Sequence, residues 1–113
     1  MDKKDFYKKI SGYTEENFIF DDPHFSKRCE EYDLSKEWII DGVIKRKWYV
    51  RILNQDRPKV YKVYFELSKH KLLKLIIDFE IHNKIRLRTI RIISERKSDQ
   101  LAKVEKQLRK SRF

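Results

Sequence analysis

Apolar and polar side chains alternate along residues 73–93, and this alternation constrains the fold more than any other feature of the 113-residue chain. From Leu73 to Ile81 every odd position is apolar, and the charged side chains stand at even positions. A period of two residues is typical of a strand with one buried face. The pattern pauses at His82–Lys84 and resumes over Ile85–Ile93, so the segment predicts a β-hairpin that turns at Asn83.

The same period predicts two earlier strands. Apolar side chains recur at every second residue over Trp48–Ile52 and again over Tyr61–Leu67, on either side of the turn segment Asn54–Pro58. Four consecutive strands joined by short loops predict an antiparallel meander. In the last strand the apolar positions change from odd to even near Thr89. A β-bulge there would explain the change, and the alternative is a strand covered by helices on both faces.

Helix signals precede the strands. Asp2 is suited to cap a short helix, Asp22–Pro23 to open a second helix, and Ser35 to cap a third that runs to about Lys45. Residues 94–112 have the composition of a basic helix with a narrow apolar stripe, which either folds back on the sheet or projects as an arm. This order predicts an α+β fold, with N-terminal helices packed on a four-stranded antiparallel sheet and a basic C-terminal helix.

At this length the chain is expected to form a single domain, with an N-terminal extension over residues 1–21, an α+β core over 22–95 and the C-terminal helix over 96–113. The one cysteine, Cys29, excludes an intrachain disulfide and suits a reducing cytoplasm. It forms no metal-ligand spacing with His70 and His82, so no metal or cofactor is predicted. No apolar run approaches the ~20 residues that span a bilayer, and the N-terminus lacks the core of a signal peptide. We therefore expect a cytoplasmic protein.

The net charge of +10 is concentrated in the C-terminal part of the chain. Residues 1–45 contain 8 Lys+Arg and 11 Asp+Glu, whereas residues 46–113 contain 20 and 7. Such a field attracts polyanions, with RNA or DNA as the first candidate, an acidic protein as the second and anionic lipid as the third. The alternative is a charged surface that binds no anion.

Five cations are grouped at the end of the hairpin: Arg86, Arg88, Arg91, Arg96 and Lys97. Arg86 and Arg88 share one face of a strand, so they could grip neighbouring phosphates, because the guanidinium fork stays charged and bonds pairs of oxygens. The alternative is a solvated outer face on which Asp78 and Glu80 oppose the arginines.

His24 and Arg28 are four residues apart at the start of a predicted helix, hence on one face. An imidazole beside a guanidinium is a candidate acid/base with an anion stabiliser, and a structural histidine is the alternative. Aromatic side chains also interleave with basic ones on the first two predicted strands, namely Trp48, Tyr49, Tyr61 and Tyr64. They could stack unpaired bases or pack in the core.

Two segments carry a resemblance to a known family. In Pro23–Ser35, a histidine and an arginine four residues later lead through an apolar-Ser step into a second helix; in Ile90–Lys97, an apolar-arginine strand runs into a basic helix. Together they resemble small proteins related to the BrnT and RelE-like toxins of toxin–antitoxin pairs, over about residues 22–105. The resemblance implies a helices-then-sheet domain whose toxin members cut RNA without metal. It also implies that His24 and Arg28 lie near the site, with Arg91 and Arg96 close to the phosphate.

The sequence thus predicts a nucleic-acid-directed basic protein, with a metal-independent endoribonuclease as the leading hypothesis. In that reaction a ribose 2′-hydroxyl attacks the adjacent phosphate, which requires a base, a stabilising cation and an acid. The candidate catalytic residues are His24, Arg28 and Arg91, and the candidate nucleic-acid-binding residues are Arg86, Arg88, Arg96 and Lys97. A non-catalytic RNA- or DNA-binding module, and a protein that docks an acidic antitoxin, are the alternatives.

Overall fold

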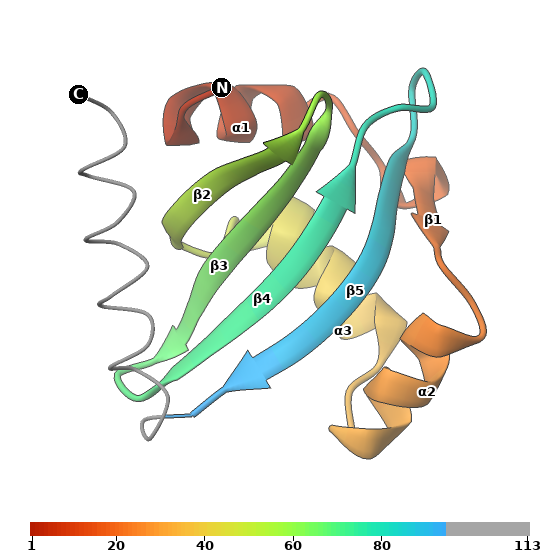
Figure 1. Ribbon diagram of the computed structural model, residues 1–113, viewed down its shortest axis with the longest axis vertical. Coiled ribbons are helices and arrows are strands. Elements are labelled where there is room, and N and C mark those ends of the chain that lie inside the picture. Colours follow the sequence, from red (N-terminus) through yellow and green to blue (C-terminus); the bar gives the residue numbers. More distant parts are fainter. Residues whose placement is uncertain (95–113) are drawn as a thin grey trace.

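A five-stranded mixed sheet is the centre of the computed structural model, which describes residues 1–94. The strands lie in the order β1-β5-β4-β3-β2 (Figure 1). Their bounds are Phe18–Phe20 for β1, Val50–Arg57 for β2, Val60–Ser68 for β3, Lys71–Asp78 for β4 and Ile85–Ile93 for β5. Strands β2 to β5 form the predicted antiparallel meander. The α+β class is therefore confirmed.

The prediction of four antiparallel strands was wrong, because β1 adds a fifth strand that runs parallel to β5. Its three residues, Phe-Ile-Phe, are too few to display a period, so the sequence predicted no strand in this part of the N-terminal extension. Phe18 is aligned with Ile85, and Phe20 with Leu87. The backbone groups on the free edge of β5 bind this short segment, and that edge exists only in the folded sheet.

Three α-helices and two other helical turns complete the described chain. The α-helices are α1 (Lys3–Ile10), α2 (His24–Glu31) and α3 (Lys36–Ile40), the turns η1 (Glu15–Asn17) and the π-helical η2 (Asp41–Lys45). Asp2 and Ser35 cap α1 and α3 as predicted, each accepting a backbone N–H with its side chain. The second helix begins one residue later than expected, at His24, and Asp22 Oδ1 accepts the N–H of Ser26 at 3.0 Å. The predicted C-terminal helix lies outside the described residues.

The helices pack on one face of the sheet and enclose the core (Figure 1). The apolar sides of α1, α2 and α3 contribute Phe6, Phe25 and Ile39, all at most 1% exposed. They face inward-pointing strand residues such as Leu75 and Ile77. We call the opposite side of the sheet the outer face. No helix among residues 1–94 combines the length and the hydrophobicity needed to cross a membrane.

The predicted bulge is present in β5. Ile76 is aligned with Thr89 and Ile77 with Leu87, so Arg88 is the extra residue. The bulge allows Leu87 and Ile90 to point into the core although they stand at positions of opposite parity. The hairpin turn contains Asn83 with a positive φ of 58°, a conformation that Asn tolerates. However, β4 ends at Asp78 rather than continuing to Ile81, whose side chain is 47% exposed.

Candidate functional site

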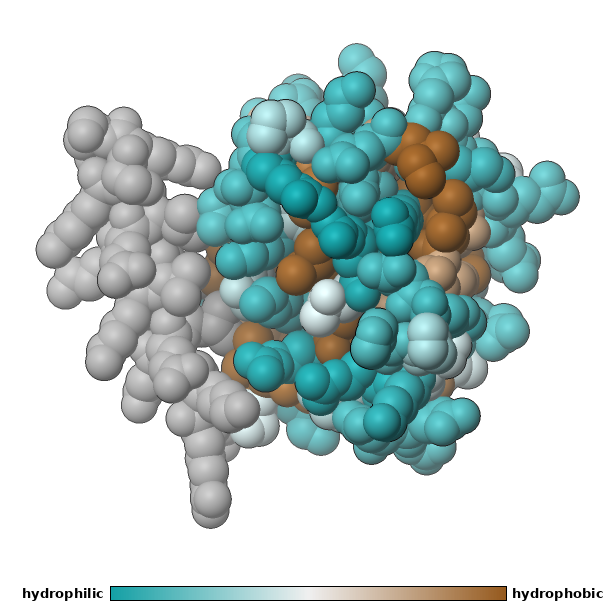
Figure 2. All heavy atoms as spheres, turned by 45° about the vertical axis from the view of Figure 1, so that its right-hand side comes forward, coloured by the Kyte–Doolittle hydropathy of each residue, from teal (hydrophilic) through white to brown (hydrophobic). Residues whose placement is uncertain are grey.

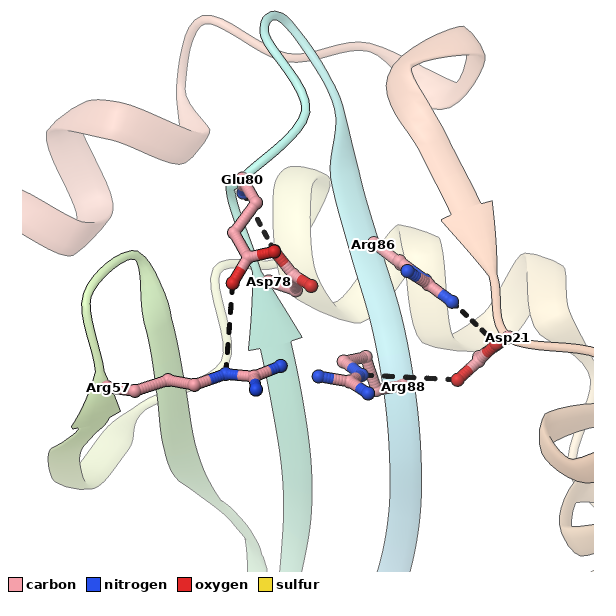
Figure 3. A network of polar contacts seen from close by, with 6 residues as sticks. All are labelled: Asp21, Arg57, Asp78, Glu80, Arg86 and Arg88. Atoms are coloured by element: carbon pink, nitrogen blue, oxygen red, sulfur yellow. Dashed lines mark hydrogen bonds and ion pairs between the residues drawn. The ribbon is translucent and has the colours of Figure 1, made fainter.

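The arginines of β5 are divided between two sites. Arg86 and Arg88 lie before and at the bulge and converge on one carboxylate, that of Asp21, just after β1 (Figure 3). The distance from Arg86 Nη2 to Asp21 Oδ1 is 2.8 Å, and that from Arg88 Nε to Asp21 Oδ2 is 4.0 Å. The side chains are each about one-third exposed. Two predicted phosphate grips are thus brought together, but with a counter-charge between them.

Asp21 was missed in the sequence because it follows a strand too short to be recognised. The hydrogen bond from Arg86 lowers the pKa of Asp21 most strongly, partial burial opposes it, and the charges of Arg86, Arg88 and His24 lower it further. The same bond raises the pKa of Arg86. Because the charge of His24 contributes to the lowered pKa of Asp21, this first residue of α2 lies within electrostatic reach of the Asp21 carboxylate. On the side of the molecule that carries β1 and α2, the surface is mostly hydrophilic (Figure 2).

A second set of charges continues this network across the outer face. Arg57 on β2 and Arg88 on β5 extend toward each other over β4 (Figure 3). Arg57 Nε lies 3.7 Å from Glu80 Oε1, and Asp78 Oδ1 accepts the backbone N–H of Glu80 at 2.7 Å. Asp78 is aligned with Arg86, as the alternative interpretation expected, yet Arg86 binds Asp21 instead. The three arginines and three carboxylates of this network balance, so these six side chains together carry no net charge.

The cationic surplus of the outer face lies farther along the strands, at Lys62, Lys74 and Arg91, which we call the outer-face cationic cluster. Arg91 on β5 is aligned with Lys74 on β4, and Lys74 with Tyr64 on β3. Lys74 Nζ lies 5.8 Å from the centre of the Tyr64 ring, within reach of a cation–π interaction.

The protonated form of Lys74 is disfavoured by its surroundings. Burial contributes most to the lowered pKa of Lys74, followed by the charges of Lys62 and Arg91, while Asp56 opposes the shift. Asp56 is already paired with Lys62, with 3.6 Å between Oδ1 and Nζ. Within residues 1–94 no carboxylate forms an ion pair with Lys74 or Arg91. The cluster therefore keeps a positive potential that a bound anion would relieve.

The proposed catalytic residues are not gathered at one point. Arg28 Nη1 lies 3.4 Å from Glu31 Oε2 on the same helix, and both side chains are about half exposed. Arg91 follows Arg88 by three residues, about 10 Å along a strand, and belongs to the cationic cluster rather than to the surroundings of Asp21. Arg96 and Lys97 lie outside the described residues.

Most of the candidate stacking aromatics pack in the protein. Tyr61 and Tyr64 are 9% and 7% exposed, and burial raises the pKa of Tyr64. Trp48 packs against Trp38 with 4.7 Å between ring centres. Tyr49 is 59% exposed, with Lys3 Nζ 5.5 Å from its ring centre, so it alone of the four presents a face that a base could reach.

A hollow of about 550 Å³ lies between η1 and the α3–η2 segment. Its lining includes three carboxylates, Glu15, Glu37 and Asp41, against one cation, Lys45, so its charge is opposite in sign to that of the outer-face cationic cluster. No three His, Cys, Asp or Glu side chains within residues 1–94 are arranged to hold a metal ion.

Comparison with known proteins places the chain in no family. No family model matches it, and no curated protein or solved structure matches it significantly. The resemblance to BrnT and RelE-like toxins therefore stays a prediction.

Proposed function

We propose that the protein binds RNA through the outer face of its sheet. The observation that carries the proposal is the outer-face cationic cluster, in which Lys74 and Arg91 repel each other and neither forms an ion pair with a carboxylate of residues 1–94. Neighbouring β-strands lie about 4.8 Å apart, so successive phosphates of a single-stranded RNA that crosses the sheet would meet cations on successive β-strands. DNA would meet the same charges. We expect binding to occur in the cytoplasm, whose reducing conditions suit the single cysteine, Cys29.

Replacing one cation tests this proposal. For single strands each neutralised phosphate contributes about −0.7 to the slope of log affinity against log salt. Lys74→Gln should therefore make this slope shallower by about 0.7. Extrapolated from 1 M salt down to 50 mM, a twentyfold range, this change in slope corresponds to about eightfold weaker binding at 50 mM. Fluorescence anisotropy of a labelled single-stranded RNA measures both quantities.

Lys4→Gln is the matched control, because it removes the same charge from an exposed position on α1. If Lys4→Gln and Lys74→Gln weaken binding equally, the interaction depends on net charge and not on this surface. Competition by poly-glutamate at equal charge would instead favour an acidic protein as the partner, as an antitoxin would be.

A second candidate function is a metal-independent endoribonuclease, favoured by the position of His24 beside the Asp21, Arg86 and Arg88 group. Cleavage of RNA in EDTA should then fall about 100-fold or more in His24→Ala, the usual contribution of a general acid or base. Binding should persist in that variant, whereas Arg91→Ala should weaken it. Lys27→Ala, an exposed change on the same helix, is the control for the fold of α2. Unchanged cleavage in His24→Ala would exclude the histidine from catalysis.

A further inference from the structure

The outer face carries a second apolar cluster that is separate from the core. It consists of Ile52, Tyr64 and Leu72, with Ile93 packed against them. The first three are 5%, 7% and 6% exposed. The α-helices of residues 1–94 pack on the other side of the sheet, so none of them covers this cluster.

The outer apolar cluster crosses four neighbouring strands. Leu72 on β4 is aligned with Ile93 on β5, and Ile52 on β2 with Tyr64 on β3. Three steps between strands, each about 4.8 Å, give the cluster a width of about 14 Å. A sheet face that no other element covers usually carries polar side chains, so a cluster of nearly buried apolar side chains on the outer face indicates that another element packs here.

The chain itself supplies an occupant. Ile93 is both a member of the cluster and the last residue of β5, so the residues after Ser94 leave the sheet from the border of the cluster. Leu101, Val104 and Leu108 follow at spacings of three and four residues, the pattern of one helix face. Along a helix they extend about 10 Å, close to the width of the cluster.

We propose that residues 95–113 dock on the outer apolar cluster, with Leu101, Val104 and Leu108 packed over Ile52, Tyr64 and Leu72. The stripe is too narrow to stabilise an isolated helix of this length, so docking and helix formation are coupled. A segment of the same chain is favoured over a second copy, because its connection at Ser94 keeps it at a high effective concentration beside the cluster.

Docking of this segment should depend on salt concentration in the opposite way to RNA binding. Residues 95–113 contain seven Lys+Arg and three Asp+Glu, and docking brings this charge of +4 toward Lys74 and Arg91. Salt screens that repulsion, so docking should strengthen as salt rises. Binding of RNA should weaken as salt rises. The two proposals can therefore fail independently of each other.

Methyl-labelled full-length protein provides a direct test. We expect nuclear Overhauser contacts between the methyl groups of Leu101, Val104 or Leu108 and those of Ile52 or Leu72. Val104→Asp should abolish these contacts and speed amide exchange at Ile52. Ala102→Asp, which adds the same charge off the stripe, should leave both unchanged.

Two results would overturn the proposal. The first is the absence of these contacts in the full-length protein, together with equal rates of amide exchange at Ile52 in Val104→Asp and Ala102→Asp. The second is the appearance of the contacts between labelled and unlabelled molecules in a mixed sample, which would assign the outer apolar cluster to a second copy of the chain.

Discussion

Of the two glycines in the protein, Gly42 is the one at which an added methyl group should disturb the structure. It is the second residue of η2, and a Cβ built there overlaps the indole ring of Trp48 at Cε2, Cζ2 and Cη2. Carbon atoms in contact normally lie about 3.5–4.0 Å apart, so the ring would have to move aside. Trp48 has little room to do so, because it packs between Trp38 and Phe65 with ring centres 4.7 and 5.8 Å away.

The magnitude follows from two opposing terms. Overpacking of this kind destabilises by about 1–3 kcal/mol, while alanine in place of glycine in a helix returns up to about 1 kcal/mol. We expect Gly42→Ala to lose about 1–2 kcal/mol of unfolding free energy. At about 4–8 °C per kcal/mol, the melting temperature should fall by roughly 4–16 °C.

Thermal unfolding followed by circular dichroism measures this change, and Gly12→Ala is its matched control. A Cβ on Gly12 meets only Lys9 O at 3.7 Å, an ordinary contact, so that variant should melt at or above the temperature of the wild-type protein. In a Trp48→Leu background, which lacks the overlapping ring, Gly42→Ala should lose most of its effect. An unchanged melting temperature in Gly42→Ala would refute the close packing of the Trp48 indole ring against Gly42 of η2.

Two further predictions concern α1 and the Asp21 site. Tyr7→Phe should lower the unfolding free energy by roughly 1–3 kcal/mol, because the Tyr7 hydroxyl donates to Trp48 O at 2.8 Å and accepts from the N–H of Val50 at 2.7 Å. Denaturant unfolding measures this loss. Equal stability of Tyr7→Phe and of Tyr49→Phe, the control at an exposed tyrosine, would contradict the prediction. The lowered pKa of Asp21 means that its ionised form stabilises the fold above the unfolded value near 3.9, and that this stability is lost as the pH falls through the folded pKa. Unfolding free energy should therefore fall more steeply with acid in the wild-type protein than in Asp21→Asn, and parallel curves would disprove the role of the carboxylate.

Local patterns in the sequence predicted much of the fold correctly. The period of two over Leu73–Ile77 and Ile85–Leu87 placed β4 and β5, and the change of parity near Thr89 located the bulge, because each depends on neighbours along the chain. Asp2 and Ser35 were recognised as caps for the same reason, since a cap bonds backbone groups only three residues away.

Charge alone was a less complete guide to the candidate site. The sequence grouped Arg86, Arg88 and Arg91 as one run, but the bulge and the parallel pairing of β1 divide them. Asp21 reaches Arg86 across 65 positions of sequence, a contact that no local spacing reveals. Lys74 joins Arg91 only because β4 and β5 are aligned at that register.

By itself the sequence determined the class of fold, the hairpin and the presence of a strong positive charge, because hydrophobic period, capping and composition are properties of neighbouring residues or of the whole chain. The tertiary structure alone decided which cations keep their charge and which are neutralised. Ion pairs depend on distances of a few ångströms between side chains, and strand register sets those distances.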